Sequence, residues 1–400
     1  MIQAALEELK VVDLTHYIAG PYCTKLLADY GADVVKVERP GAGDGARRLG
    51  PFPGDVPHPE KSAIFLHLNT NKRSIMLDLK TRRGVEVLKD LVRGADVLVE
   101  NFTPRVMPSL GLDYETLSAI NPELVMVSIS NFGQSGPYRD YRGSEIVNYA
   151  LGGPMYCAGL PDRQPVKLGG SVVSYLAGAH GAAATAVAVV GRGVRGHGDH
   201  VDVSIMETQA GSPDRRTPML VGYQYTGQVN HRGMLAAPPV RPCKDGYVNI
   251  QSGLAMIDRT AKMLGMPEIA TDPRFTDPVE AAKSENADLF ESAYLEWLSD
   301  KTMREAWEAA QNARLMSGPI YTFADVMADP NFHERGFWER IAHPDAGGWL
   351  FPGVPFTTFG APKAPRRRAP RLGEHTDEVL RGLGYGPRKI ATLRRQGVAA

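Results

Sequence analysis

The chain has little of several things on which a quick functional assignment could rest. Cysteine occurs only three times in 400 residues, at Cys23, Cys157 and Cys243. These positions are widely spaced and odd in number, so they form neither a disulfide framework nor a CxxC metal site. Lys plus Arg and Asp plus Glu both number 45, and this balance gives no basic field that would favour nucleic acid. We expect reduced cysteines and no nucleic-acid partner.

Long hydrophobic runs and the common catalytic motifs are also missing. The N-terminus has no apolar segment of signal-peptide length, and the longest apolar run, residues 181–190, is too short to span a bilayer. No GxSxG nucleophile elbow, Walker loop or HExxH motif occurs. We therefore expect a cytoplasmic protein without a membrane partner, and the standard hydrolase, kinase and zinc-peptidase chemistries lose their usual support.

The first half of the chain repeats a strand followed by a helix. Residues 33–38 (DVVKVE) and 124–130 (LVMVSIS) are β-branched and apolar, as is typical of buried strands. This alternation predicts a parallel sheet covered by helices, the doubly wound α/β class. The helix expected at 172–190 is so rich in Ala and Gly that another helix must approach it closely. The expected strands are 9–14, 33–38, 74–79, 96–100, 124–130 and 201–205, and the other expected helices are 20–30, 81–93 and 145–151.

The pattern changes after about residue 213. From 241 to about 324, short strands precede helices expected at 279–298 and 302–313, which indicates a second domain. From residue 330 the chain is rich in Pro, Gly and Arg, which favours an extended segment with a short helix near 376–383. The expected parts are 1–210, 225–325 and 330–400.

Two local motifs carry little weight. GAGDG at 41–45 follows a strand but lacks the GxGxxG spacing that opens a helix against a pyrophosphate, so we expect a flexible loop. HGDH at 197–200 offers two histidines three residues apart without a third ligand of suitable spacing. The sequence therefore predicts no metal cofactor.

Stronger evidence comes from strings spread over nearly the whole chain. They are LLADYGADVVKVERPGAGD, LNTNKRSIMLDLK, ADVLVENFTPRVMPSLGLDYETLSAINPELV, SISNFGQSGPYRD and APRLGEHTDEVL, together with residues 13–21 and 165–208. In this order and spacing they resemble the family III CoA-transferases, the group of formyl-CoA transferase and α-methylacyl-CoA racemase. The resemblance implies a large Rossmann-like domain built from 1–210 and from a strap at 330–400 that returns to it. It also implies a small α+β domain at 225–325 and an interlocked dimer.

The resemblance further implies that the ligand is coenzyme A, bound as an acyl-CoA, and that a carboxylic acid is the second substrate. Binding CoA requires cations near its phosphates, backbone donors and an apolar slot. Most of the matching positions follow predicted strand ends, where open α/β sheets bind ligands. The positions that match the family's CoA contacts are Ile18, Ala19, Arg39, Lys72, Arg73, Asn101, Phe102, Arg105 and Arg142.

The chain departs from the family at the nucleophile. In PVKLGGSVVSYLAG the tenth position is Ser174, where family transferases carry an aspartate. The transferase reaction needs that carboxylate to form a mixed anhydride and then an enzyme thioester with CoA. An ester of serine would retain the acyl group instead of relaying CoA. The racemase pair of bases is also missing, because Ser144 stands at the histidine position and Ser174 at the aspartate position.

Three residues remain as candidate catalytic groups. Ser174 itself is one. Glu145 matches a functionally important acid of formyl-CoA transferase, although a carboxylate that caps a helix N-terminus is a competing interpretation. His16 lies in the loop that approaches the thioester, where a hydrogen-bonded structural histidine is the alternative. Tyr175 is expected to pack rather than react.

Four hypotheses stay open at this point. The chain is a subunit of a heteromeric CoA-transferase whose paralogous partner supplies the aspartate. Alternatively it is an isomerase, racemase, lyase or hydrolase of acyl-CoA that uses Glu145, His16 or Ser174, or it is a non-catalytic protein that binds CoA esters. The fourth hypothesis is that Ser174 is an engineered replacement of an aspartate. Homomeric assembly is the alternative to the heteromer. Acyl selectivity is expected from side chains of the second domain and from the loops near 155–165 and 224–235, with Tyr156, Tyr223 and Tyr225 in or beside these loops.

Overall fold

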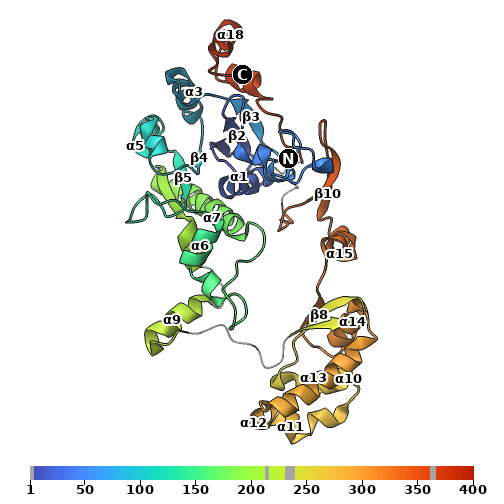
Figure 1. Cartoon of the computed structure of the whole chain (residues 1–400). Coiled ribbons are helices and arrows are strands. Elements are labelled where there is room, and N and C mark those ends of the chain that lie inside the picture. Colours follow the sequence, from blue (N-terminus) through green and yellow to red (C-terminus); the bar gives the residue numbers. More distant parts are fainter. Residues whose placement is uncertain (1–3, 212–215, 230–238, 361–365) are drawn as a thin grey trace. The chain divides into compact units, whose positions relative to one another are not determined.

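The structure is a computed structural model that describes residues 4–211, 216–229, 239–360 and 366–400. The chain divides into two compact units (Figure 1). The sheet unit comprises Met1–Gly159, Gln164–His231 and Gly336–Ala400, and the small unit comprises Leu160–Arg163 and Arg232–Arg335.

The sheet unit is built on a parallel sheet whose described strands follow the order β3-β2-β1-β4-β5-β6. This is the strand order of the Rossmann fold, and it confirms the expected doubly wound α/β class. The strand order reverses between β1 and β4, which are hydrogen-bonded to each other. In open α/β sheets, ligands bind in the crevice outside the carboxyl ends of the strands at such a reversal. The strands are β1 Lys10–Asp13, β2 Asp33–Glu38, β3 Arg73–Met76, β4 Val97–Glu100, β5 Val125–Ser130 and β6 Asp199–Ser204.

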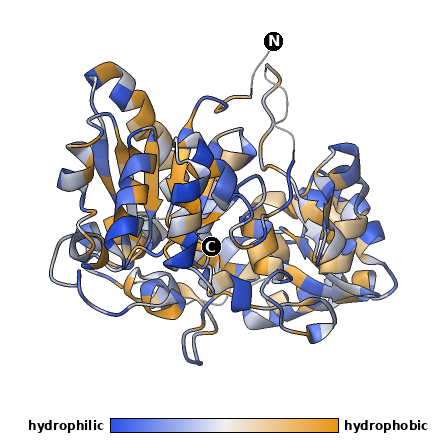
Figure 2. Cartoon of the chain, turned by 90° about the horizontal axis from the view of Figure 1, so that it is seen from above, coloured by the Kyte–Doolittle hydropathy of each residue, from blue (hydrophilic) through white to orange (hydrophobic). Residues whose placement is uncertain are grey.

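Hydrophobic residues on both faces of the strands explain why helices cover the sheet on both sides. Val11 belongs to one hydrophobic cluster and the next residue, Val12, belongs to the other. The same alternation separates Val97 from Leu98, because successive side chains of a strand point to opposite faces. Figure 2 shows the strands coloured largely as hydrophobic. The described helices of this unit are α1 Ala19–Asp29, α2 Ala63–Leu68, α3 Arg82–Val92, α4 Val106–Ser109, α5 Tyr114–Ser118, α6 Glu145–Leu151, α7 Val172–Arg195, α8 Ile205–Ala210, α9 Arg216–Thr226, α17 Thr376–Gly382 and α18 Pro387–Arg395.

Helix α7 is approached closely by α1, as its small residues predict. A Cβ atom added at Gly178 would lie 2.5 Å from the carbonyl oxygen of Ala19, and one added at Gly181 would lie 3.3 Å from the sulfur of Cys23. Glycine at these positions therefore permits the contact between the two helices. By length and composition alone α7 could cross a membrane. Its buried residues instead pack in the core beneath the sheet.

The small unit contains a three-stranded antiparallel sheet and short helices. The sequence predicts one helix at 279–298, but the structure has two, because Lys283 adopts an extended backbone (φ −69°, ψ 135°). The strands are β7 Val240–Cys243, β8 Gly246–Ile250 and β9 Ser317–Pro319. The described helices are α10 Ile257–Leu264, α11 Pro273–Thr276, α12 Pro278–Ala281, α13 Ser284–Ser299, α14 Met303–Asn312, α15 Phe323–Ala328 and α16 Pro330–Glu334.

The C-terminal region is more regular than its composition suggests. The expected extended segment is wrong for residues 338–352, which form an antiparallel hairpin of β10 Trp338–His343 and β11 Gly347–Pro352. The last residues then reach β3 of the sheet. The N–H of His375 donates to the carbonyl of Ser74, and that of Asp78 donates to the carbonyl of Val398. Of the Pro- and Arg-rich string, residues 361–365 lie outside the described residues.

Candidate active site

Two cavities lie at the carboxyl edge of the sheet, within the sheet unit. The larger has a volume of about 790 Å³ and the smaller about 530 Å³. Tyr17, Asn101 and Phe102 line both cavities and form the wall between them. Of the residues expected to bind or react, the larger cavity contains Ile18, Ala19, Asn101, Phe102, Arg105, Arg142 and Ser174, and the smaller contains His16, Arg39, Asn101 and Phe102.

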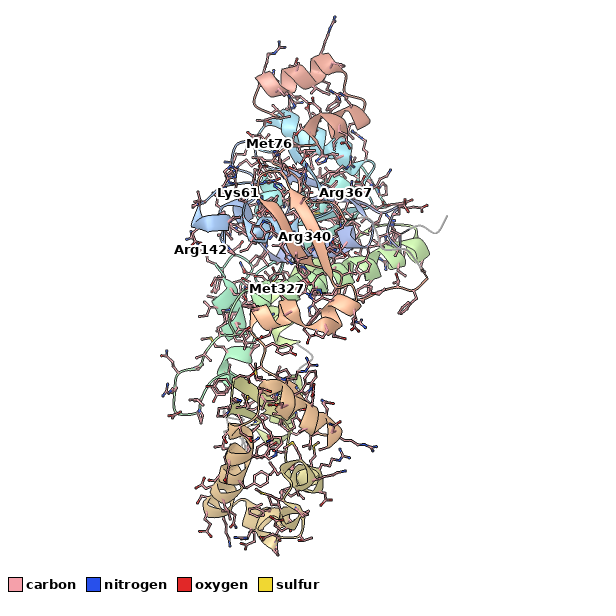
Figure 3. All side chains as sticks on the ribbon, turned by 90° about the vertical axis from the view of Figure 1, so that its right-hand side faces the viewer. Lys61, Met76, Arg142, Met327, Arg340 and Arg367 are labelled. Carbon is pink, nitrogen blue, oxygen red and sulfur yellow. The ribbon has the colours of Figure 1, made fainter. Side chains whose placement is uncertain are left out.

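Cationic side chains reach these cavities without a protein partner. Arg142 lines the larger cavity, and Arg39 and Lys80 line the smaller. All three are exposed, and in the described part of the chain their side chains make no ion pair or hydrogen bond. Figure 3 shows Arg142 at the border of the sheet unit, clear of the hairpin that carries Arg340. These side chains are free to bind an anionic ligand.

Arg139 adds a more constrained cation to the larger cavity. Its Nε atom is buried and has no hydrogen-bond partner. A buried donor without a partner is costly, so this atom favours a ligand that accepts from it. Sequence reasoning missed Arg139 as well as Lys80 and Arg48. The available signal was that Lys80 and Arg139 both lie inside the family strings, at 68–80 and 128–140.

Arg105 lines the larger cavity but is not free. Its Nε and one terminal nitrogen donate to the two carboxylate oxygens of Asp140 at 2.8 and 2.7 Å. These hydrogen bonds to the Asp140 carboxylate raise the pKa of Arg105. An anionic ligand would have to compete with Asp140 for this side chain.

Lys72 does not line either cavity. Its ammonium group is buried and has four acceptors, which are Asp13 at 3.1 Å, Asn69 at 2.9 Å, Thr24 at 2.8 Å and the carbonyl of Pro21 at 2.9 Å. Burial lowers the pKa of Lys72 to about 8 despite the nearby carboxylate of Asp13. The expected role of Lys72 at the CoA phosphates conflicts with this saturation, so we exclude it from the site.

Arg73 is also engaged elsewhere. It contacts Asp33 at 2.6 Å and Glu378 at 3.0 Å. Neither cavity is lined by Arg73. The two adjacent cations of the NTNKRS string therefore serve the interior and the C-terminal region of the sheet unit, and not the cavities, because they stand at the amino end of β3 and the cavities lie at the carboxyl edge.

His16 and Asn101 form a unit at the wall between the cavities. The amide side chain of Asn101 accepts from the N–H of His16 and donates to its carbonyl oxygen, both at 2.8 Å. The imidazole ring is tilted against Phe102 with a centroid distance of 5.7 Å. His16 lines the smaller cavity and Ser174 the larger, so the two candidate catalytic residues do not share a cavity.

Ser174 lies in the first turn of α7, beside Glu145. The carboxylate of Glu145 accepts from the N–H of Val173 at 2.8 Å, from the N–H of Ser174 at 3.1 Å and from the Ser174 hydroxyl at 2.7 Å. Ser171, the N-cap residue, provides no side-chain hydrogen bond. Glu145 thus caps α7 from a neighbouring helix, which satisfies backbone donors that the helix itself cannot.

A loop lysine completes this arrangement. The ammonium group of Lys167 donates to the carbonyl oxygens of Leu168 and Gly170 and lies 3.8 Å from a Glu145 oxygen. Tyr175 packs edge-on against Tyr22 at a centroid distance of 4.8 Å. Ser174 is consequently the only one of this group that also lines the larger cavity, among the residues that the structure describes.

Glu100, at the end of β4, is a buried acid that sequence reasoning missed. It accepts a hydrogen bond of 2.8 Å from the N–H of Phe102 and so supports the wall between the cavities. Burial raises the pKa of Glu100 to about 7, against the opposing effect of hydrogen bonds from Ser128 and Phe102. Its position in the ENF string was visible, but its burial was not.

The residues expected to select the acyl group do not line these cavities. Tyr223 and Tyr225 lie on α9, and Tyr156 precedes the loop to α7, and all three are exposed. Residues 230–235 of the second loop lie outside the described residues. In the described ranges no group of three His, Cys, Asp or Glu side chains is placed to hold a metal ion. His200 of the HGDH string instead contacts the Ser128 hydroxyl at 2.9 Å.

Comparison with known proteins gives similarity over nearly the full length. The model of CoA-transferase family III matches residues 6–376. Succinyl-CoA–D-citramalate CoA-transferase of Chloroflexus aurantiacus is 33% identical over 401 residues, covering 98% of both chains. Subunit BbsE of succinyl-CoA:(R)-benzylsuccinate CoA-transferase from Thauera aromatica is 32% identical, covering 97% of this chain and 96% of that one. A solved CaiB/BaiF family protein from Brucella suis is 32% identical with a TM-score of 0.82, covering 96% of this chain and 100% of that one.

Proposed function

This chain belongs to CoA-transferase family III, and we propose that it is the acyl-CoA-binding subunit of a heteromeric CoA-transferase whose paralogous partner supplies the aspartate nucleophile. The family's enzymes move CoA between an acyl-CoA and a carboxylic acid. One observation carries the proposal. The side chain at the nucleophile position, Ser174, already donates its hydroxyl hydrogen to Glu145, while Arg139 and Arg142 line the same cavity without an ion-pair partner in the described residues.

The chemistry of transfer explains why this serine cannot replace the aspartate. A carboxylate attacks the thioester carbonyl, and CoA leaves as a thiolate while a mixed anhydride forms. The thiolate then attacks the enzyme's carbonyl carbon, which releases the donor acid and leaves CoA on the enzyme as a thioester. A second acid repeats these steps in reverse. A serine ester has no enzyme carbonyl for the thiolate to attack, so CoA cannot be relayed.

The neighbouring carboxylate does not turn Ser174 into a strong nucleophile either. Both oxygens of Glu145 accept from backbone N–H groups of α7, so its lone pairs are largely occupied. His16 lines the other cavity. This arrangement supports a subunit that binds and positions acyl-CoA and whose partner chain performs the covalent step.

An exposed apolar face of α7 supports assembly with a second chain. Val187, Val190 and Val194 are 73, 71 and 86% exposed, and their spacing places them on one side of the helix. Exposed apolar stripes of this kind are typical of subunit interfaces. One of the similar proteins, BbsE of Thauera aromatica, is itself a subunit of a CoA-transferase. We expect the interlocked arrangement of the family, in the cytoplasm, with 1–210, 225–325 and 330–400 as the parts of each chain.

The test is to purify the chain alone and together with each paralogue that carries the aspartate. We expect no CoA transfer by the chain alone and transfer by a mixed complex, measured with succinyl-CoA as the donor and a panel of carboxylic acids as acceptors. Replacing the partner's aspartate by asparagine should abolish the activity of the complex. Transfer by the lone chain at an ordinary rate would contradict the proposal.

A second candidate function is an acyl-CoA hydrolase, and the 2.7 Å contact between Ser174 and Glu145 is the observation that favours it. In this alternative Ser174 forms an acyl ester, CoA leaves as the thiol, and water releases the acid. Incubation of the pure chain with acyl-CoAs would then release free thiol without any acceptor acid. Thiol release that Ser174→Ala abolishes would favour the hydrolase over the transferase subunit.

A further inference from the structure

The turn between β1 and α1 holds a backbone conformation that its sequence does not favour. Tyr17 has a φ angle of 67°, in the left-handed region that residues with a β-carbon rarely adopt. Its side chain is 54% exposed and lines both cavities. A ligand that spans the two cavities must therefore cross Tyr17, and something must hold this turn in place.

Buried charged groups hold the turn from below. The Asp44 carboxylate accepts from the N–H of Tyr17 at 2.8 Å and from the N–H of Ala46 at 2.9 Å. Lys36 lies 2.9 Å from the other oxygen of Asp44 and donates to the carbonyl of Thr15 at 2.7 Å. Asp44 and Lys36 are both fully buried. The turn is thus fixed on both sides of His16 by one ion pair.

The electrostatic surroundings keep this ion pair charged. Burial would raise the pKa of Asp44, but Lys36 together with His16 and the Ala46 N–H hold it well below its ordinary value. Nearby Asp13 and Asp44 in turn keep the pKa of Lys36 above its ordinary value despite burial. Because both groups stay ionised, the contact with the Tyr17 N–H persists at neutral pH.

The residue after Asp44 provides the surface on which the Tyr17 ring rests. A Cβ atom at Gly45 would lie 2.4 Å from both Cε1 and Cζ of Tyr17, far inside van der Waals contact. Glycine at position 45 therefore leaves room for the ring in this position, and a larger residue there would displace it. The GAGDG string, expected as a flexible loop, is in fact buried from residue 43 onward, and its expected flexibility is wrong for that part.

We propose that Asp44 and Gly45 are positioning residues of the acyl-CoA site, which place Tyr17 as the wall that a CoA thioester crosses between the two cavities. Asp44 fixes the backbone of the turn between β1 and α1 through its hydrogen bond with the Tyr17 N–H. Gly45 leaves the space that the Tyr17 ring occupies. The inference rests on the proposed function for the identity of the ligand. The hold of Asp44 on the Tyr17 N–H, which we call the clamp, rests on contacts that can be measured without any ligand.

Three variants test the two halves of this inference separately. Asp44→Asn removes the charge that holds the Tyr17 N–H, and Gly45→Ala displaces the ring without touching the ion pair. Gly94→Ala is the matched control, because a Cβ atom there meets nothing within 4 Å. Two readouts are taken on the full chain: the dissociation constant for CoA by calorimetry, and hydrogen exchange of the peptide spanning residues 14–20.

We expect Asp44→Asn to speed exchange in residues 14–20 and to weaken CoA binding about tenfold. Gly45→Ala should weaken CoA binding to a similar extent while exchange stays near that of the unmodified chain, because the Tyr17 N–H keeps its acceptor. Gly94→Ala should change neither. Unchanged exchange in Asp44→Asn would overturn the clamp, and unchanged CoA affinity in Gly45→Ala would overturn the role of the ring.

A Tyr17→Gly background separates positioning from general destabilisation. Glycine adopts a positive φ without restraint and has no ring, so Gly45→Ala should lose its effect on CoA affinity there. If Gly45→Ala weakens binding equally in both backgrounds, the positioning role is wrong. If the unmodified chain does not bind CoA at millimolar concentrations, the proposed function fails and the CoA role falls with it. Normal CoA binding with unaffected variants would contradict the positioning role alone.

Discussion

The two halves of the candidate site treat their charged groups in opposite ways. At the carboxyl edge of the sheet, Arg39, Lys80 and Arg142 point to the cavities without a protein partner. At the N-terminus of α7, Glu145 and the Ser174 hydroxyl are bonded to each other and to the helix backbone. The cations of the first region can still bind a ligand, whereas the polar groups of the second region already bind each other and the helix backbone.

This difference shows that ligand recognition and covalent chemistry have separate structural requirements. Unpaired cations cost little at an exposed edge, because water solvates them until an anion arrives. A reactive carboxylate near a second carboxylate is more demanding, since like charges at close range oppose ionisation of both. A serine at position 174 avoids such repulsion with Glu145, so a cavity lined by cations can exist without a second carboxylate beside it.

The largest expected effect tests whether the α7 region lacks only its nucleophile. Ser174→Asp places a carboxylate at the edge of the larger cavity, where it can attack a thioester. We expect the lone chain to gain CoA transfer activity by about a hundredfold or more over background, because covalent relay replaces an absent pathway. The measurement is transfer from succinyl-CoA to carboxylic acids, followed by chromatography of the CoA esters.

Ser174→Asn is the control for this gain, since it matches the size of aspartate without the charge. Equal activity of the aspartate and asparagine variants would show that the cavity is not otherwise competent. It would also mean that the cavities lined by cations serve a different reaction or none. A combined Ser174→Asp, Glu145→Gln variant would reveal whether the adjacent carboxylate restrains the gain.

The binding region can be weakened one cation at a time. Arg139→Ala and Arg142→Ala should each raise the dissociation constant for CoA about tenfold at low salt, because each removes a charge-assisted bond to a phosphate. The loss should shrink as salt is added. Arg82→Ala is the control, because Arg82 is 93% exposed and pairs with Glu86 on α3. CoA affinity that neither cavity variant alters would place the ligand elsewhere.

Glu100, a buried acid beside the binding region, makes the free energy of unfolding depend on pH. The pKa of Glu100 is about 7 in the folded chain and about 4.5 when unfolded, so the folded state retains a proton that the unfolded state loses between these values. Stability from this group therefore falls as pH rises from 4.5 to 7. Glu100→Gln should remove that fall and be more stable than the unmodified chain at pH 8, by about 3 kcal/mol.

Chemical denaturation at pH 4.5 and at pH 8 measures this difference. The two proteins should have similar free energies of unfolding at the lower pH, where Glu100 is protonated in the folded state and about half protonated in the unfolded state. Glu115→Gln, a change at an exposed first-turn residue of α5, is the control. A pH dependence that Glu100→Gln leaves unaltered would show that the buried carboxyl is not the group responsible.

The smallest expected effect concerns the α7 region. Glu145→Gln keeps one acceptor for the helix N-terminus but loses the charge that favours it, so we expect a loss of about 1 kcal/mol in the free energy of unfolding. CoA affinity should not change, because Glu145 does not line the cavities. A marked loss of CoA affinity would show that Glu145 also contributes to CoA binding, and that the two regions are not functionally separate.

Prediction from sequence succeeded where local chemistry decides structure. Residues 33–38 were predicted as a strand and form β2 with the same bounds, since a run of β-branched residues buried on both faces leaves few alternatives. The close approach of α1 to α7 followed from Gly178 and Gly181. The helix predicted at 279–298 is two helices in the structure, because the backbone at Lys283 is extended. No strong sequence signal marks this break.

The candidate site was predictable in its positions but not in its partners. Ile18, Ala19, Asn101 and Ser174 were expected from family motifs, and the structure brings them to one cavity. Lys72 belongs to the same kind of motif, yet its ammonium group is saturated inside the unit. Whether a lysine beside a strand end faces ligand or interior depends on distant residues, which a linear pattern does not specify.

The amino-acid sequence by itself determined the doubly wound sheet, the family and the serine at position 174, because periodicity and residue identity are properties of the chain. Only the tertiary structure decided which charges are free and which are consumed. Lys36 forms ion pairs with Asp13 and Asp44 after folding brings three segments together, whereas Arg142 finds no partner among the residues that the structure describes. Charge pairing depends on distances of a few ångströms between remote residues, and only the folded chain sets those distances.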